Sequence, residues 1–265
     1  MNTMRSLSRW FACAVSTCLL SHAGIAQTAE VRLGNLKAGK ILFLGNSITA
    51  VPQLNMPTWW GLSASTAAKD YVHLLAADLD AKTGGHLTLL PTTAPVTNAD
   101  GSVEQCDSNV INVADVFERG YASYDASKIK KQLAWKADIV ILQFSENVPM
   151  TTFNADVFGT ALKKLVADLK ESSNPHIFMA SHIMGVNPPV DEIKRKVCAE
   201  DPTRRVFVDL TSVAKDPANM GAYAHPNDKG MALIAEAMFQ AIAAHSTATA
   251  TATPQASTPA TDAKK

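Results

Sequence analysis

The chain of 265 residues has no excess charge of either sign. It carries 24 Lys and Arg residues against 24 Asp and Glu residues, so its formal net charge at pH 7 is zero. The basic residues are scattered along the sequence rather than gathered in one segment. Binding to nucleic acid or to an anionic membrane surface needs a concentrated basic face. We therefore expect neither kind of partner.

Several motifs that carry well-defined chemistry are also absent. The sequence contains no Gly-x-Ser-x-Gly, which excludes the nucleophile elbow of an α/β-hydrolase. It contains no Walker-type phosphate loop, and no group of His, Cys and Asp residues has the spacing of a zinc site. We therefore expect no metal ion and no cofactor.

Long hydrophobic runs are missing too, apart from a short one near the N-terminus. Arg5 and Arg9 begin this region, the apolar stretch WFACAVSTCLL follows them, and small residues continue to Ala26. The run is too short to span a bilayer comfortably, and Gly24 and Ala26 satisfy the small-residue rule for signal cleavage. The sequence predicts a cleaved signal peptide over 1–26 and a periplasmic or secreted protein without stable membrane insertion.

Cysteine is scarce, with four residues in the chain. Cys13 and Cys18 would leave with the signal peptide, so Cys106 and Cys198 would remain. An even pair in an exported protein can form a disulfide, but two unpaired small apolar residues fit the sequence equally well.

The C-terminal segment 246–265 has low complexity and almost no bulky apolar residues. Such a segment cannot bury enough surface to offset the entropy of ordering, so we predict a disordered tail. The folded domain would then occupy 27–245.

Within this domain, short apolar runs alternate with segments of helical periodicity. Strands are predicted at 41–45, 86–91, 137–144, 176–181 and 204–210, and helices at 67–81, 125–135, 156–170 and 229–242. This alternation predicts a single three-layer α/β/α domain with a mostly parallel five-stranded sheet, and residues 92–118 are expected to be irregular.

Three polar side chains follow predicted strands at the edge where parallel sheets bind ligands. Ser47 follows the first strand, Asn147 follows the strand at 137–144, and His225 precedes the last helix. Each has an ordinary alternative: a helix N-cap, the start of a polar loop, and a loop histidine. Together they supply what acyl transfer needs, a hydroxyl to attack, an amide to stabilise an oxyanion and an imidazole to take the proton.

Three sequence blocks then resemble the SGNH/GDSL-type hydrolases. ILFLGNSITAVP contains the first block in a Gly-Asn-Ser form, FSENV corresponds to the block that carries the family's asparagine, and HPNDKGMALIA corresponds to the block around its histidine. The stretches WWGLSAS and KDYVHLL are similar to a bacterial esterase-like subgroup. The resemblance covers most of residues 40–243 and implies the flavodoxin-like architecture of that family.

The resemblance implies a role for each matching residue. Ser47 would be the nucleophile, His225 the general base, and the Ser47 N–H and Asn147 amide oxyanion donors. For the N–H that a glycine of the second block usually supplies, Ala114 is the preferred candidate and Gly120 its rival.

The sequence also departs from the family pattern. Ser145 and Val148 differ from the usual third block. Ala222 stands where the family usually has the aspartate of a triad. This departure favours a Ser–His dyad in which a backbone carbonyl of residues 220–224 orients His225. Apart from the missing aspartate, Asp209 is the carboxylate that could reach His225.

The expected activity is that of a secreted serine esterase. Trp59 and Trp60 follow the nucleophile and could form either part of the core or a stacking surface for a sugar or an acyl chain. A carbohydrate O-acetylesterase is the preferred interpretation. A lipase, lysophospholipase or thioesterase is the alternative within the class, and a non-catalytic carbohydrate-binding module is the alternative outside it.

Overall fold

The computed structural model describes residues 30–52, 59–89, 108–185 and 187–251. Its centre is a five-stranded sheet in the order β6-β3-β7-β8-β9, in which every neighbouring pair is parallel. The strands are β3 (Ile41–Gly45), β6 (Val110–Asn112), β7 (Ile139–Gln143), β8 (His176–Ala180) and β9 (Arg205–Val208). The three central strands β3, β7 and β8 are buried along their whole length, which explains their continuous apolar sequences.

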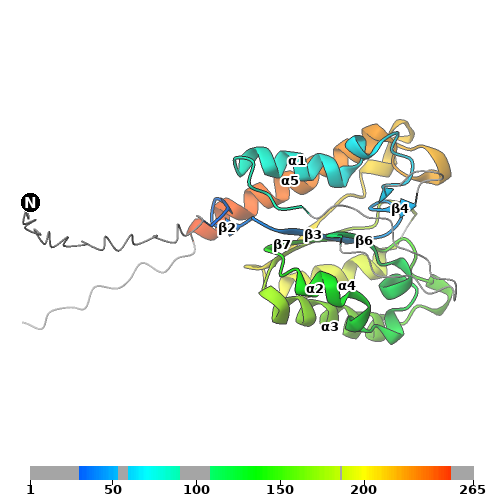
Figure 1. Cartoon of the computed structure of the whole chain (residues 1–265). Helices are drawn as coiled ribbons and strands as arrows, with labels where there is room; N and C mark the ends of the chain where they lie inside the picture. Colours follow the sequence, from blue (N-terminus) through cyan, green and yellow to red (C-terminus); the bar gives the residue numbers. More distant parts are fainter. Residues whose placement is uncertain (1–29, 53–58, 90–107, 186, 252–265) are drawn as a thin grey trace, which may run out of the picture.

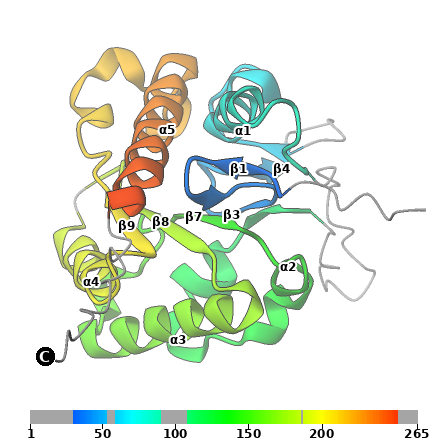
Figure 2. The same ribbon diagram turned by 90° about the vertical axis from the view of Figure 1, so that its left-hand side faces the viewer.

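Helices cover both faces of the sheet (Figures 1 and 2). One face carries α1 and α5, and the other carries α2, α3 and α4. The helices are α1 (Tyr71–Lys82), α2 (Lys130–Ala134), α3 (Ala155–Ser173), α4 (Pro188–Ala199) and α5 (Asp228–Thr251). Each face has its own hydrophobic core, so the three-layer α/β/α fold predicted from the sequence is confirmed.

Two short antiparallel pairs lie outside the main sheet. β1 (Arg32–Leu33) pairs with β2 (Leu36–Lys37), and β4 (Val51–Pro52) pairs with β5 (Trp59–Trp60). Short 3₁₀ or π turns fill several connections, including Ala67–Lys69, Ala114–Glu118 and Ala222–Ala224.

One strand was predicted in the wrong place. In the segment expected as a strand at 86–91, Thr88 forms only an isolated parallel bridge with Lys40, and residues 90–91 lie outside the described residues. β7 occupies one edge of β3 along its whole length, and β6 pairs with β3 on the other edge from Phe43 onward. The strand that pairs with this edge of β3 is therefore β6 rather than the predicted 86–91, and β6 lies inside the region 92–118 that was expected to be irregular.

The last helix is longer than predicted. The periodic pattern ends at 242, but α5 continues to Thr251, six residues into the segment predicted as a tail. His245 and Ser246 are buried, and the Ser246 carbonyl accepts a hydrogen bond of 3.2 Å from the Asn35 N–H. A tail that begins at 246 is therefore wrong at its boundary, because the helix end packs against the β1–β2 hairpin.

Other predictions fall on residues outside the described ranges. The signal peptide over 1–26, Cys106 and residues 252–265 belong to this group. Cys198 is a buried free thiol in α4, and burial raises the pKa of this thiol to about 11. Among the described helices, none is both long enough and apolar enough to cross a membrane.

Candidate active site

The turn after β3 presents one accessible side chain. Residues 41–50 are buried except Ser47, which is partly exposed. The turn folds back tightly, since a Cβ at Gly45 would lie 1.7 Å from the Thr49 hydroxyl oxygen. The Asn46 side chain accepts a hydrogen bond of 2.9 Å from the Ile48 N–H and closes the turn. Glycine and asparagine thus shape a turn that exposes a single hydroxyl at the carboxyl edge of the sheet.

His225 lies against this hydroxyl. The Ser47 Oγ is 2.7 Å from the His225 Nε2, although the two residues are 178 positions apart in the sequence. The His225 Nδ1 is 2.8 Å from the backbone carbonyl oxygen of Tyr223. A carbonyl can only accept, so Nδ1 carries the proton and Nε2 is free to accept one from Ser47. This is the tautomer that a general base requires.

The loop before His225 has an unusual backbone. Tyr223 and Ala224 both have φ values of 55°, in the left-handed region that non-glycine residues rarely adopt. Tyr223 is 82% exposed, while His225 is 7% exposed. Strained residues next to functional groups are held in place by the surrounding structure, and here the strain aims the Tyr223 carbonyl at the imidazole.

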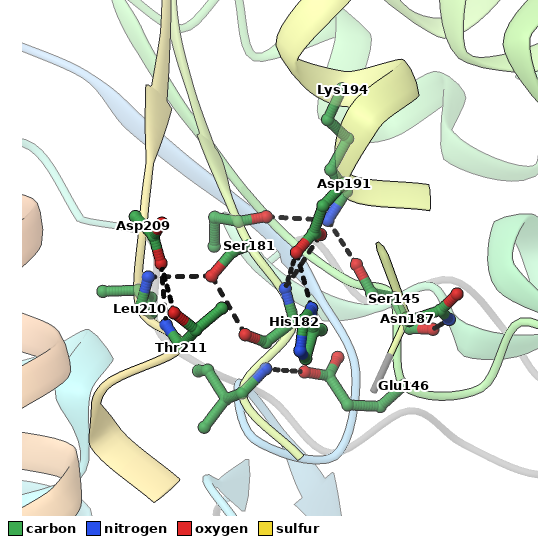
Figure 3. A network of polar contacts seen from close by, with 12 residues as sticks. Ser145, Glu146, Ser181, His182, Asn187, Asp191, Lys194, Asp209, Leu210 and Thr211 are labelled. Atoms are coloured by element: carbon green, nitrogen blue, oxygen red, sulfur yellow. Dashed lines mark hydrogen bonds and ion pairs between the residues drawn. The ribbon is translucent and has the colours of Figure 1, made fainter. Parts of the chain in front are cut away.

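No carboxylate takes the place of that carbonyl among the described contacts of His225. Asp209, the predicted alternative, accepts a hydrogen bond of 2.9 Å from Arg195 and one of 3.0 Å from the Thr211 N–H. Bonds from Thr211 and Arg195 lower its pKa to about 2, and Figure 3 shows Asp209 beside Thr211. Ala222 contributes its backbone carbonyl, which accepts from the His225 N–H at 3.1 Å.

Asn147 lies in the loop after β7 with its amide orientation fixed on both sides. Its Nδ2 donates to Glu118 at 2.7 Å, and its Oδ1 accepts from Arg119 at 2.7 Å. One of the two Nδ2 hydrogens is thereby used, which leaves the second for a ligand. Within the described residues the Ser47 N–H donates to no other group, so it too remains available.

The predicted third donor is already engaged. The Ala114 N–H donates to the Asn112 side chain at 2.9 Å, and Ala114 is buried. This contact argues against the preference for Ala114. Its rival Gly120 is partly exposed and has no room for a Cβ, which would lie 2.6 Å from the Asp115 carbonyl oxygen.

The two tryptophans separate into different environments. Trp60 is buried in the core beneath α1 and α5, and its indole N–H donates to the Ala64 carbonyl at 3.1 Å. This environment favours the core alternative for Trp60. Trp59 is partly buried and packs against the same core, so a role in substrate binding stays a prediction for it.

Two further polar groups lie near this edge, and of these Lys194 was not singled out by the sequence. Lys194 is fully buried in α4 and donates to the carbonyls of Phe144 and Ala180 and, at 2.5 Å, to the Ser145 hydroxyl. His182 faces Asp191, with 2.5 Å between Nδ1 and Oδ2 (Figure 3). Lys194 and Asp191 both lie on the buried face of α4, where sequence reasoning expects apolar residues. No group of three or more His, Cys, Asp or Glu residues in the described ranges could hold a metal ion.

Comparison with known proteins gives matches among solved structures. No family model and no curated protein matches the chain. The esterase EstA from Pseudoalteromonas sp. matches at 16% identity over 77% of this chain and 96% of its own, with a TM-score of 0.51. TesA matches at 13% identity over 78% of this chain and 99% of its own, also with a TM-score of 0.51.

A third match is an active-site mutant of a family two carbohydrate esterase from Clostridium thermocellum. It is 18% identical, with a TM-score of 0.48, and this chain spans 63% of its length. At these identities the likeness to EstA and TesA shows the fold. The single α/β domain with a parallel sheet that the sequence predicted is therefore one that these two proteins share.

Proposed function

We propose that this chain is an SGNH-type serine esterase in which Ser47 and His225 act as a dyad. The observation that carries the proposal is the 2.7 Å contact between the Ser47 Oγ and the His225 Nε2, with Nδ1 bonded to a carbonyl. A nucleophile, a base and a group that orients the base are the parts that acyl transfer requires.

The reaction follows from this geometry. The Ser47 Oγ attacks the ester carbonyl while its proton moves to the His225 Nε2. The Ser47 N–H and the second Asn147 hydrogen would stabilise the negative oxygen of the tetrahedral intermediate. The imidazolium returns the proton to the leaving alcohol, and an acyl-enzyme remains. A water molecule activated by the same imidazole then releases the acid and restores Ser47.

The substrate that we propose is an acetyl ester on a carbohydrate, hydrolysed outside the cytoplasm. The predicted signal peptide supports export, and the exposed Tyr223 ring offers an apolar face next to the dyad. A comparison of acyl lengths on p-nitrophenyl esters, with acetylated xylan as a polymer substrate, tests this choice. Preference for chains of eight or more carbons would favour the lipase alternative.

The test of the dyad is Ser47→Ala. Removal of one partly exposed hydroxyl should leave the fold intact and lower ester hydrolysis by about 10³-fold or more. A fluorophosphonate probe should label the parent protein and not the variant. A parent protein that stays unlabelled and inactive would instead favour the carbohydrate-binding module.

A further inference from the structure

Glu118 is a fully buried carboxylate that accepts hydrogen bonds from four donors. One oxygen accepts from the Ser145 N–H at 2.7 Å and from the Asn147 N–H at 3.2 Å. The same oxygen accepts from the Asn46 side-chain amide at 3.2 Å, and the other accepts from the Asn147 amide at 2.7 Å. These partners belong to the two loops that carry the proposed nucleophile and the proposed oxyanion donor.

Glu146 holds the same asparagine from a second direction. Its Oε2 accepts from the Asn46 amide at 2.6 Å, and its Oε1 accepts from the Ile183 N–H at 2.7 Å. Figure 3 shows the Glu146 side chain close to the segment that contains His182. The Asn46 amide thus lies between two carboxylates, Glu118 from the turn after β6 and Glu146 from the loop after β7.

This arrangement accounts for the Gly-Asn-Ser form of the first block. Burial raises the pKa of the Glu118 carboxyl, and the charge of Glu146 raises it further. An aspartate at position 46 would replace the donating nitrogen with a third carboxylate oxygen, at 2.6 and 3.2 Å from the other two. Like charges at such distances strongly disfavour ionisation of all three groups. The Asn46 amide instead donates a hydrogen bond to each of the two glutamate carboxylates.

We propose that Glu118 and Glu146 are positioning residues for the proposed esterase, which clamp the Asn46 amide and so fix the Ser47 turn against the Asn147 loop. This proposal rests on the proposed function, because it assigns the two glutamates a task only if Ser47 and Asn147 act on an ester.

Glu118→Gln tests the first half of the clamp. Both oxygens of Glu118 accept hydrogen bonds, so in either orientation the NH₂ group of the glutamine side chain faces a hydrogen-bond donor. Small displacements of a catalytic group carry large rate penalties, so kcat should fall by about 10–100-fold while KM stays within about twofold. The matched control is Asp138→Asn, because Asp138 accepts from the N–H groups of Gly39 and Lys40, each at 2.9 Å, at the opposite edge of the sheet. Both variants should lower the thermal midpoint, but only Glu118→Gln should lower kcat.

The second half is tested by rescue. Asn46→Asp alone should lower kcat. The double variant with Asn46→Asp and Glu146→Gln should have a kcat at least about tenfold higher than Asn46→Asp, because the glutamine side chain can donate the hydrogen bond that the asparagine donated. Circular dichroism checks that each variant is folded. A double variant no better than Asn46→Asp, or a kcat of Glu118→Gln equal to that of Asp138→Asn, overturns the clamp.

Failure of the clamp can be told apart from failure of the esterase. If fluorophosphonate labels Ser47 in the parent protein and Glu118→Gln reacts at the same rate, the positioning role is wrong and the esterase stands. If the parent protein is not labelled and hydrolyses no ester, the proposed function itself is wrong.

Discussion

Individual polar side chains explain how the site was found and where sequence reasoning stopped. Ser47 and His225 could be identified because they follow strands and match sequence blocks, and the structure brings them to 2.7 Å. The role of the Tyr223 carbonyl could be predicted only as a neutral acceptor in the loop. Glu118 gave no signal, because a glutamate in a short irregular segment looks solvated until its donors are placed around it.

His176 shows how a buried imidazole couples stability to pH. The Arg204 guanidinium donates to its Nε2 at 3.1 Å, and its Nδ1 is 3.1 Å from the His245 Nε2. Arginine can only donate, so His176 is held neutral with its proton on Nδ1. Burial, and then the charge of Arg204, lower the pKa of His176 from 6.5 to about 4.

The lowered pKa predicts a loss of stability in mild acid. The unfolded chain protonates this histidine below pH 6.5 and the folded chain resists until about 4, so stability falls as the pH drops through that window. Between pH 7 and 5 the loss from this residue should be about 2 kcal/mol. Urea unfolding at both pH values should show a smaller loss in His176→Asn. Equal pH dependence in the two proteins would contradict this account.

At the scale of elements, strongly periodic segments were predicted and short or charged ones were not. The strand at 41–45 was predicted at its observed bounds, and α3 differs from the predicted 156–170 by one residue at its start and three at its end. β6 has only three residues, too few for a pattern. Helix α4 was missed because its buried face includes Asp191 and Lys194, which interrupt the apolar spacing of Val190 and Val197.

Lys194 joins this helix to the ends of two strands. Its ammonium donates to the carbonyls of Phe144, after β7, and Ala180, at the end of β8, and to the Ser145 hydroxyl. The pairing of β7 with β8 ends at Leu142 and Met179, and buried carbonyls beyond it need donors from outside that ladder. The buried charge thus replaces missing ladder hydrogen bonds.

Lys194→Met should therefore destabilise the protein. It removes three hydrogen bonds and leaves the Ala180 carbonyl without this donor at about 1–3 kcal/mol, although the Phe144 carbonyl still accepts from the Ser145 hydroxyl. Relief of the desolvated charge offsets part of that cost. We expect a net loss of about 2–3 kcal/mol in the free energy of unfolding. Lys196→Met on the exposed face of the same helix is the control and should change stability by less than about 0.5 kcal/mol. A Lys194→Met protein as stable as the control would mean that desolvation of the ammonium outweighs its three bonds.

At the scale of the whole molecule, the two ends of the described domain hold one another. The β1–β2 hairpin turns at Gly34, whose φ of 55° and closeness to the Ser246 carbonyl leave no room for a side chain. Asn35 donates to that carbonyl through its backbone N–H at 3.2 Å and its amide at 3.3 Å. Composition alone put Ser246 in a disordered tail, because contacts made by a carbonyl oxygen leave no trace in the amino-acid sequence.

Two truncations locate the true end of the folded domain. A chain that ends at Thr251 keeps all of α5 and should unfold at the same urea concentration as the full-length protein. A chain that ends at Ala244 loses the last part of α5 and, with it, the His245 ring. The centre of this ring lies 5.2 Å from that of His176 and 5.7 Å from that of Phe178. This chain also loses the Ser246 carbonyl that anchors the hairpin, so its free energy of unfolding should fall by about 2–4 kcal/mol. If both truncated chains match the full-length protein, the domain ends where the sequence placed it and the contact between the hairpin and α5 contributes nothing.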